Sequence, residues 1–344
     1  MIKKILIGLI VVGAVAGFFL WEKYEAISSP NVPADLQNDM VEIPTNSTFS
    51  EVVNILLQNG QLIDTASFRE VAELMKYKKT TMRAGRYKIE SDWSNRTLIT
   101  HLRGGKQAPV NVVLNTGRFV EDIAGKAAKT IEADSSDLVQ LFHNQSVITP
   151  KGFTDETLMS LFIPNTYEFF WNTNAEKFLE KMIKEHEIFW KKNNREQKAA
   201  AMKMSKEEVY TLASIVERET NANVEKPRIA GVYLNRLKKG MLLQADPTAV
   251  FATRDFTARR VLNKHINFDS PYNTYKYVGL PPGPISIASI SSIDAVLNSE
   301  NHEYIYFCAK PDNSGLHAFA KTLAGHNRNA NKFRAWLNQQ RIMN

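Results

Sequence analysis

The sequence predicts an α+β protein with one N-terminal transmembrane helix, a small module and a larger domain. Three observations predict it. The chain has 344 residues, which exceeds one ordinary domain. An apolar run without charges opens it. Short strand-like runs then alternate with amphipathic helical runs. A composition of 44% hydrophobic and 23% charged residues is typical of a folded globular protein, so both parts can bury a core.

The N-terminal run predicts a membrane anchor. Residues 5–21 carry no charge and would form a helix about 25 Å long, enough to cross a bilayer core with its flanks. Lys3 and Lys4 precede the run, so residues 1–4 are expected in the cytoplasm and everything after Glu22 outside the cytoplasmic (inner) membrane. A cleaved signal peptide is the alternative, because Ala14 and Ala16 form a small-x-small pattern. Cleavage there would leave an apolar stretch downstream.

A first module is expected at residues 40–108, after a linker at residues 22–39. Thr48 and Glu51 form a capping box before an apolar helical stripe, and Gly60 follows it. The spacing predicts strands over 41–44 and 85–89 and helices over 49–59, 65–75 and 95–103. This order resembles a LysM-like module of the kind that binds glycan containing N-acetylglucosamine. A packing domain without a ligand is the alternative.

The larger domain is expected at residues 109–340. The pattern predicts a strand at 109–114 and helices over 120–130, 175–193 and 205–220. Residues 304–309 are interpreted as a buried strand that holds the one cysteine, Cys308. A lone cysteine forms no internal disulfide, and in an apolar run it is more typical of a core residue than of a nucleophile.

Charge and residue spacing exclude some functions. The formal net charge is +7, from 43 Lys and Arg against 36 Asp and Glu, but the charges are dispersed. Nucleic-acid binders concentrate basic residues on one face, so we expect no nucleic-acid partner. No His, Cys, Asp or Glu cluster has the spacing of metal ligands, so we expect neither a metal nor another cofactor.

Two glutamates on the helix at 205–220 are candidates for acid–base chemistry. Leu212, Ile215 and Val216 share one apolar face, which Glu219 joins. Glu217 lies about 160° away around the helix, so both carboxylates cannot enter one cleft. Periodicity alone does not choose between them, and a solvated helix face is equally compatible with either residue.

Motifs on this helix and after it closely resemble those of the MltG (YceG-like) endolytic murein transglycosylase family, in that family's order and spacing. The matching runs are Ala213–Thr220, Val232–Leu237, Leu243–Thr248, Ser270–Tyr275, Gly279–Ile285, His317–Phe319 and His326–Asn327. The resemblance implies a YceG-like catalytic domain with Glu217 as its catalytic residue. The run Leu161–Phe169 departs from the family pattern, with Asn165 in place of an Asp, although Tyr167 could still line the cleft.

The implied reaction is cleavage of MurNAc–GlcNAc β-1,4 bonds within nascent strands, which would end strand elongation. A hydrolase needs a second carboxylate, whereas a lytic transglycosylase, a carbon–oxygen lyase, uses the sugar's own 6-hydroxyl. Asp246 is interpreted either as a substrate contact or as a turn residue before Pro247.

Amide and hydroxyl groups near these motifs are of the kind that bind sugars, with formation of turns as the alternative role for each residue. The predicted glycan-binding residues, besides Asp246, are Asn235, Gln244, Tyr272, Asn273 and Tyr275. The expected partners are peptidoglycan glycan strands, the membrane and peptidoglycan synthases. The alternative functions are a hydrolytic muramidase, with Asp246 or Glu219 as second carboxylate, and a non-catalytic wall-binding scaffold.

Overall fold

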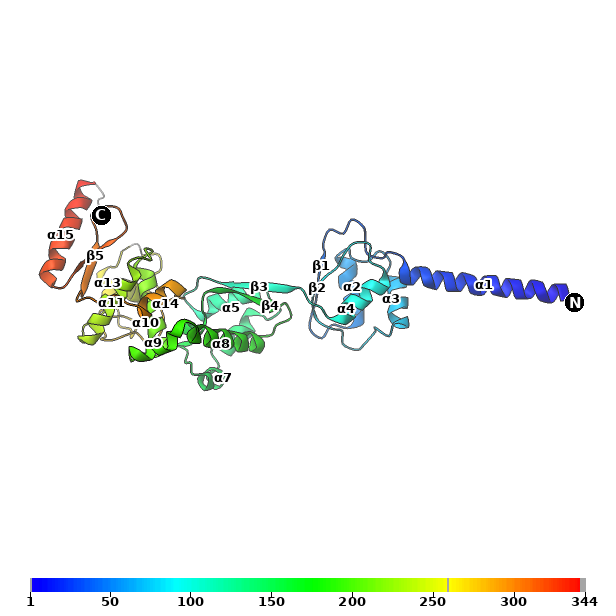
Figure 1. The fold of residues 1–344 in the computed structure, drawn as a ribbon, viewed down its shortest axis with the longest axis horizontal. Coiled ribbons are helices and arrows are strands. Elements are labelled where there is room, and N and C mark those ends of the chain that lie inside the picture. Colours follow the sequence, from blue (N-terminus) through cyan, green and yellow to red (C-terminus); the bar gives the residue numbers. More distant parts are fainter. Residues whose placement is uncertain (1, 259, 341–344) are drawn as a thin grey trace. The chain divides into compact units, whose positions relative to one another are not determined.

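The computed structural model describes residues 2–258 and 260–340. Met1 of the expected cytoplasmic segment and Arg259 of the expected larger domain lie outside the described residues. The chain forms two compact units (Figure 1). Unit 1 comprises the chain up to Val112 with Thr130–Ala133 and Glu168–Asn174, and unit 2 comprises the rest. The expected domain limits remain predictions, since these units are discontinuous in sequence.

The N-terminal helix α1 spans Ile2–Ser28 and is longer than the expected 5–21. It takes in the first part of the expected linker, because residues 22–29 contain neither Gly nor Pro, and Pro30 then disfavours a helical residue before it. The stretch Lys3–Ser28 is long and apolar enough to cross a membrane, and its apolar part is not buried by the rest of the protein. It is therefore a candidate anchor.

Unit 1 is built around two paired strands and three helices. Strand β1 (Met40–Ile43) runs antiparallel to β2 (Gly85–Lys88), with Met40 opposite Lys88. Between and after them lie α2 (Phe49–Gln58), α3 (Thr65–Leu74) and α4 (Asn95–Gly104). The Thr48–Glu51 capping box is confirmed. Apolar faces of all three helices and both strands form one core, which includes Val41, Leu56, Phe68, Tyr87 and Leu98.

Strands β3 (Pro109–Leu114) and β4 (Asn165–Phe170) pair in a two-stranded sheet. Unit 2 consists mainly of helices. In its first part these are α5 (Val120–Ala128), α6 (Ser135–Phe142), α7 (Gln145–Ile148), η1 (Thr149–Lys151), η2 (Leu158–Leu161), α8 (Ala175–Lys191), η3 (Lys192–Asn194) and α9 (Arg195–Ala201). The second part holds α10 (Lys206–Glu219), α11 (Lys226–Lys238), α12 (Asp246–Thr253), α13 (Asn263–Ile266), α14 (Ile290–Leu297), β5 (Tyr306–Ala309), β6 (His317–Ala320) and α15 (Leu323–Gln339).

The strand expected at 304–309 is shorter in the structure. Strand β5 begins at Tyr306 and pairs antiparallel with β6, with Cys308 opposite Ala318. The expectation of a fully buried strand is wrong, because every side chain of β5 is only partly buried. Helix α15 packs against both strands and α11 contacts β5, but a sheet of only two strands leaves the side chains of β5 partly exposed.

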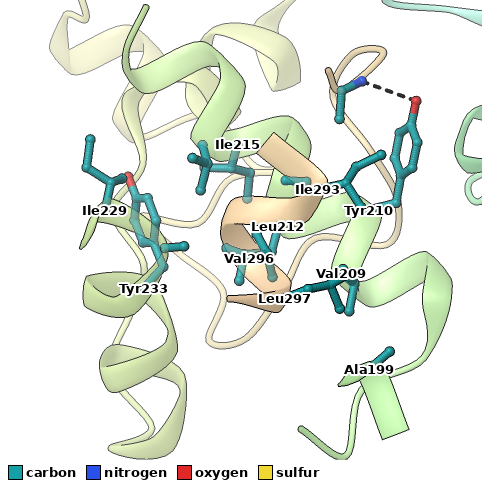
Figure 2. Packing of buried hydrophobic residues seen from close by; sticks show 14 of the residues in the cluster. Ala199, Val209, Tyr210, Leu212, Ile215, Ile229, Tyr233, Ile293, Val296 and Leu297 are labelled. Atoms are coloured by element: carbon teal, nitrogen blue, oxygen red, sulfur yellow. Dashed lines mark hydrogen bonds between the residues drawn. The ribbon is translucent and has the colours of Figure 1, made fainter. Parts of the chain in front are cut away.

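Helix α10 is the centre of the core of unit 2. The sequence predicted one apolar face, but every residue from Val209 to Val216 is buried. Helices α11 and α14 pack against α10 through Ile215, Ile293 and Val296 (Figure 2). A rigid helix of this kind can hold a reactive side chain at its exposed end with little freedom.

The loop at 281–288 is fastened to α10 by two polar side chains of the helix. The Ser214 hydroxyl accepts a hydrogen bond from Ile285 N at 3.0 Å, and the Tyr210 hydroxyl accepts one from Ala288 N at 3.1 Å (Figure 2). Both bonds are buried, so their loss would leave unpaired polar groups. The loop leads directly into α14.

Gly283 allows this loop to approach another backbone segment closely. A Cβ atom at this position would lie 1.8 Å from the carbonyl oxygen of Glu156. This oxygen belongs to the backbone, so it cannot move aside as the end of a flexible side chain could. We expect Gly283→Ala to reduce the free energy of unfolding by about 1–3 kcal/mol, measured by denaturant titration. Gly104→Ala is the matched control, because its Cβ would meet nothing within 4 Å. Equal stability of both variants would contradict this packing.

Candidate active site

Glu217 lies in the last turn of α10 and is held through one oxygen. Its Oε2 accepts hydrogen bonds from Lys226 Nζ at 2.9 Å, from Ser292 Oγ at 2.5 Å and from Ser289 Oγ. Among the described residues, Oε1 has no hydrogen-bond donor. Lys226 begins α11, while Ser289 caps α14 and accepts from Ser292 N at 3.2 Å. Three helix ends thus meet at one carboxylate oxygen.

Opposing effects set the charge of Glu217. Its side chain is 29% exposed and that of Lys226 only 5%. Burial disfavours ionisation of Glu217, but the hydrogen bonds from Ser289, Ser292 and Lys226 together outweigh it and keep its pKa below the ordinary value. Glu217 is therefore ionised near neutral pH in the free protein. This differs from the protonated acid that the implied reaction needs at its start.

A cavity of about 550 Å³ lies against Glu217. Glu217 and Arg218 form one side of it, and Ser286 and Ile287 contribute from the loop before α14. The opposite lining comes from α5 and the segment that leads into it. These residues are Asn115, Thr116, Gly117, Arg118, Glu121, Asp122, Gly125, Lys126 and Lys129. We refer to this space as the Glu217 cavity.

Glu219 lines two other cavities, of about 310 and 360 Å³. Asp246 also lines both of them. Its Oε1 accepts a hydrogen bond from the Tyr233 hydroxyl at 2.6 Å. Burial, together with the negative charge of Asp246, raises the pKa of Glu219 to about 7. The two glutamates of α10 therefore line separate spaces, as helix geometry predicts, and their pKa values are shifted in opposite directions.

Three of the predicted glycan-binding residues lie together. Gln244, Asp246 and Tyr275 line the 360 Å³ cavity beside Glu219. The Tyr275 hydroxyl donates a hydrogen bond to Asp246 Oδ1. The turn that the sequence left open as the alternative role of Asp246 does not form, because Asp246 begins helix α12. Pro247 then falls in the first helical turn, where the missing N–H removes no helical hydrogen bond.

Three others lie outside the described cavities. Asn273 has no exposed surface, and its amide donates to the carbonyl oxygens of three residues before it, so the structure contradicts a direct contact with glycan. Asn235 donates to the carbonyl oxygens of His302 and Tyr304 at 2.7 and 3.0 Å. Tyr272 packs against Phe251, with ring centroids 4.9 Å apart. All three brace loops around the cavities.

Tyr167 does not line the cleft, as the sequence had allowed. Its side chain is buried, and its hydroxyl donates to the carbonyl oxygen of Ile163 at 2.7 Å. The Tyr210 hydroxyl donates to the neighbouring Phe162 carbonyl at 2.8 Å. The backbone at Phe162 therefore supports α10 through this hydrogen bond.

Lys226, Ser289 and Ser292 were not identified from the sequence. Ser289 and Ser292 have the spacing of a helix cap, which predicts the start of α14 but no contact with Glu217. Lys226 precedes Pro227 at the start of a helix, a position typical of an exposed lysine. Within the described ranges, no group of three or more His, Cys, Asp or Glu side chains is placed to hold a metal ion.

The family model of the YceG-like family matches residues 41–332, which include the larger part of both units and every residue of the site. The chain belongs to the YceG-like family. A crystal structure of a YceG-like protein from Listeria monocytogenes is similar, with a TM-score of 0.55 and 30% identity, over 84% of this chain and 97% of that one.

Characterised relatives of this YceG-like chain carry one name. An endolytic murein transglycosylase of Bacillus subtilis is 31% identical over 310 residues, which are 85% of this chain and 84% of the relative. An endolytic murein transglycosylase of Streptococcus pneumoniae is 24% identical over 343 residues, which are 89% of this chain and 61% of that longer relative.

Proposed function

We propose that this chain is an endolytic murein transglycosylase in which Glu217 is the catalytic acid and base. It would cleave MurNAc–GlcNAc β-1,4 bonds inside glycan strands and leave 1,6-anhydroMurNAc ends. One observation carries the assignment of Glu217: three donors bind its Oε2, while Oε1 is left without a partner among the described residues, beside a cavity of about 550 Å³. The names of the relatives support the reaction.

The reaction requires two proton transfers by the same carboxyl group. Protonated Glu217 gives its proton to the glycosidic oxygen while the bond between that oxygen and C1 of MurNAc breaks. The resulting carboxylate then takes the proton of the C6 hydroxyl of the same MurNAc, whose oxygen forms the new bond to C1. Water is not consumed, so no second carboxylate is needed to activate it.

The donors around Glu217 favour the ionised form that the second step requires. The first step requires the proton, and a strand that covers the exposed part of Glu217 would supply it by desolvation, which raises the pKa of a carboxyl group. Lys226, Ser289 and Ser292 would then fix the orientation of Oε2, leaving Oε1 for proton transfer.

A muramidase is the second candidate function, and one observation favours it. Glu219 and Asp246 line the same two cavities, and the pKa of Glu219 is raised to about 7. A carboxyl group with a raised pKa beside a second carboxyl group is the pair that a hydrolase uses. In this alternative, Glu219 is the acid, Asp246 directs water, and the products have reducing ends.

We infer that helix α1 anchors the protein in the cytoplasmic membrane, with Lys3 and Lys4 on the cytoplasmic side and the chain after α1 outside. The order β1–α2–α3–β2, with its strands antiparallel, supports a LysM-like glycan-binding role for unit 1. The anchor would hold the enzyme at the membrane surface, where new glycan strands emerge. Peptidoglycan synthases at the same surface would be its partners.

The length of the products tests the proposal. Purified protein is incubated with long, uncrosslinked glycan strands, and the strand lengths are followed by chromatography. Internal cleavage predicts that strands of intermediate length appear first and that disaccharides stay scarce. Steady release of disaccharides from the earliest time point would overturn endolytic action, and unchanged strands would support the non-catalytic scaffold.

A further inference from the structure

Two arginines stand between the Glu217 cavity and the 310 Å³ cavity. Arg118 and Arg218 line both spaces. Within residues 2–258 and 260–340, neither guanidinium forms an ion pair or donates a hydrogen bond. Arg218 directly follows Glu217 on α10, so its position relative to the candidate catalytic group is fixed by one helix.

The surrounding contacts hold Arg118 close to Arg218. The Arg118 guanidinium lies over the ring of Phe256 at 4.3 Å, and its backbone N–H donates to Asp122 Oδ2 at 2.7 Å. Partial burial and the nearby charge of Arg118 lower the pKa of Arg218. Two like charges are thus kept side by side, an arrangement that a bound anion would stabilise.

The acidic residues of the Glu217 cavity are engaged elsewhere. Glu121 Oε1 lies 3.1 Å from His143 Nε2, and Asp122 accepts from the backbone of Arg118 and Phe119. Glu217 itself is paired with Lys226. The acidic side chains of this cavity thus have other partners, and Lys129 adds a further positive charge to its lining. Glu219 and Asp246 line the 310 Å³ cavity with the two arginines, but among the described residues neither carboxylate forms an ion pair with them.

We propose that Arg118 and Arg218 form a binding site for a carboxylate of the substrate, on the peptide stem of the MurNAc next to the scissile bond. The inference rests on the proposed function. A stem recurs on every MurNAc, so a carboxylate accompanies each internal bond that the enzyme can cut. A pyrophosphate occurs only at one end of a lipid-linked strand. The planar guanidinium fork matches a carboxylate through two parallel hydrogen bonds.

The test compares Arg218→Gln with the native full-length protein in detergent on two substrates. One is a strand whose stems carry free carboxylates, and the other has those carboxylates converted to amides. On the first, we expect KM to rise roughly tenfold to a hundredfold with kcat nearly unchanged, because a charge-assisted hydrogen bond is lost. On the amidated strand, both proteins should have the same, higher KM. Arg218→Lys should recover part of the loss.

Arg254→Gln is the matched control. Arg254 also lies over an aromatic ring, that of Phe119 at 5.0 Å, but lines none of the three cavities. The KM of Arg254→Gln on the free-carboxylate strand should equal that of the native protein. Equal KM values for Arg218→Gln and native protein on the free-carboxylate strand would overturn the inference. A difference that appears only on strands with a terminal pyrophosphate would overturn it in favour of a phosphate ligand.

A binding measurement separates this inference from the proposed function. Fluorescence anisotropy with a labelled, stem-bearing strand is compared between Glu217→Gln and the double variant Glu217→Gln/Arg218→Gln. Weaker binding by the double variant supports the carboxylate site even if the native protein cleaves nothing. Equal binding overturns it, whatever the outcome of the cleavage assay.

Discussion

Glu217→Gln is expected to reduce the rate of strand cleavage by roughly 10²–10⁴-fold. Gln has the size of Glu and can still accept hydrogen bonds from Ser289 and Ser292, so the site should keep its shape. It cannot transfer a proton to the glycosidic oxygen or take one from the C6 hydroxyl. The measurement is the initial rate of strand shortening, with circular dichroism to verify that the variant is folded.

Glu219→Gln is the matched comparison, because it makes the same change two residues along the same helix. Under the proposed function this variant retains cleavage well above that of Glu217→Gln, since Glu219 lines different cavities and its bond partner is Tyr233. The reverse order of activities would transfer the catalytic role to Glu219 and favour a muramidase. Native activity in Glu217→Gln would contradict the assignment outright.

Lys226→Met is expected to shift the alkaline limb of the profile of kcat/KM against pH to higher pH. Glu217 must be protonated at the start of the reaction, so kcat/KM falls as pH rises through its pKa. The positive charge of Lys226 favours the ionised carboxylate and is one of the interactions that lower this pKa. Removal of that charge raises the pKa, so the variant should stay active at pH values where the native enzyme has lost most of its activity.

The control for this experiment is Lys198→Met. Lys198 Nζ also donates a hydrogen bond, to Asn298 Oδ1 at 2.7 Å, but it lies away from Glu217 on α9. Its pH profile should match that of the native enzyme. An alkaline limb that is unchanged or shifted to lower pH in Lys226→Met would show that Lys226 does not lower the pKa of Glu217.

The helices that local patterns predicted are present in the structure. The Thr48–Glu51 box and the apolar spacing after it depend on neighbours within one turn, and α2 begins and ends within one residue of the expectation. Helix α10 was predicted equally well for its bounds. Its burial on every side could not be predicted, because that depends on α11 and α14 packing from distant parts of the chain.

The candidate site could be predicted only in part for the same reason. The family resemblance led to Glu217, but Ser289 and Ser292 lie 72 and 75 residues away and show only the pattern of a helix cap. Asn273 was expected at the glycan because its amide is of a sugar-binding kind. A side-chain amide can equally donate hydrogen bonds to buried carbonyl groups of a loop. Here the amide of Asn273 donates to three backbone carbonyl oxygens.

Mass spectrometry of the ends of the digested strands tests most directly that a single carboxyl group carries the reaction. The native enzyme should give 1,6-anhydroMurNAc at the newly formed MurNAc ends, with no oxygen from ¹⁸O-labelled water. Reducing MurNAc ends that carry the label would show that water attacked C1. That result would contradict a transglycosylase and require a second carboxylate, for which Asp246 beside Glu219 is the candidate.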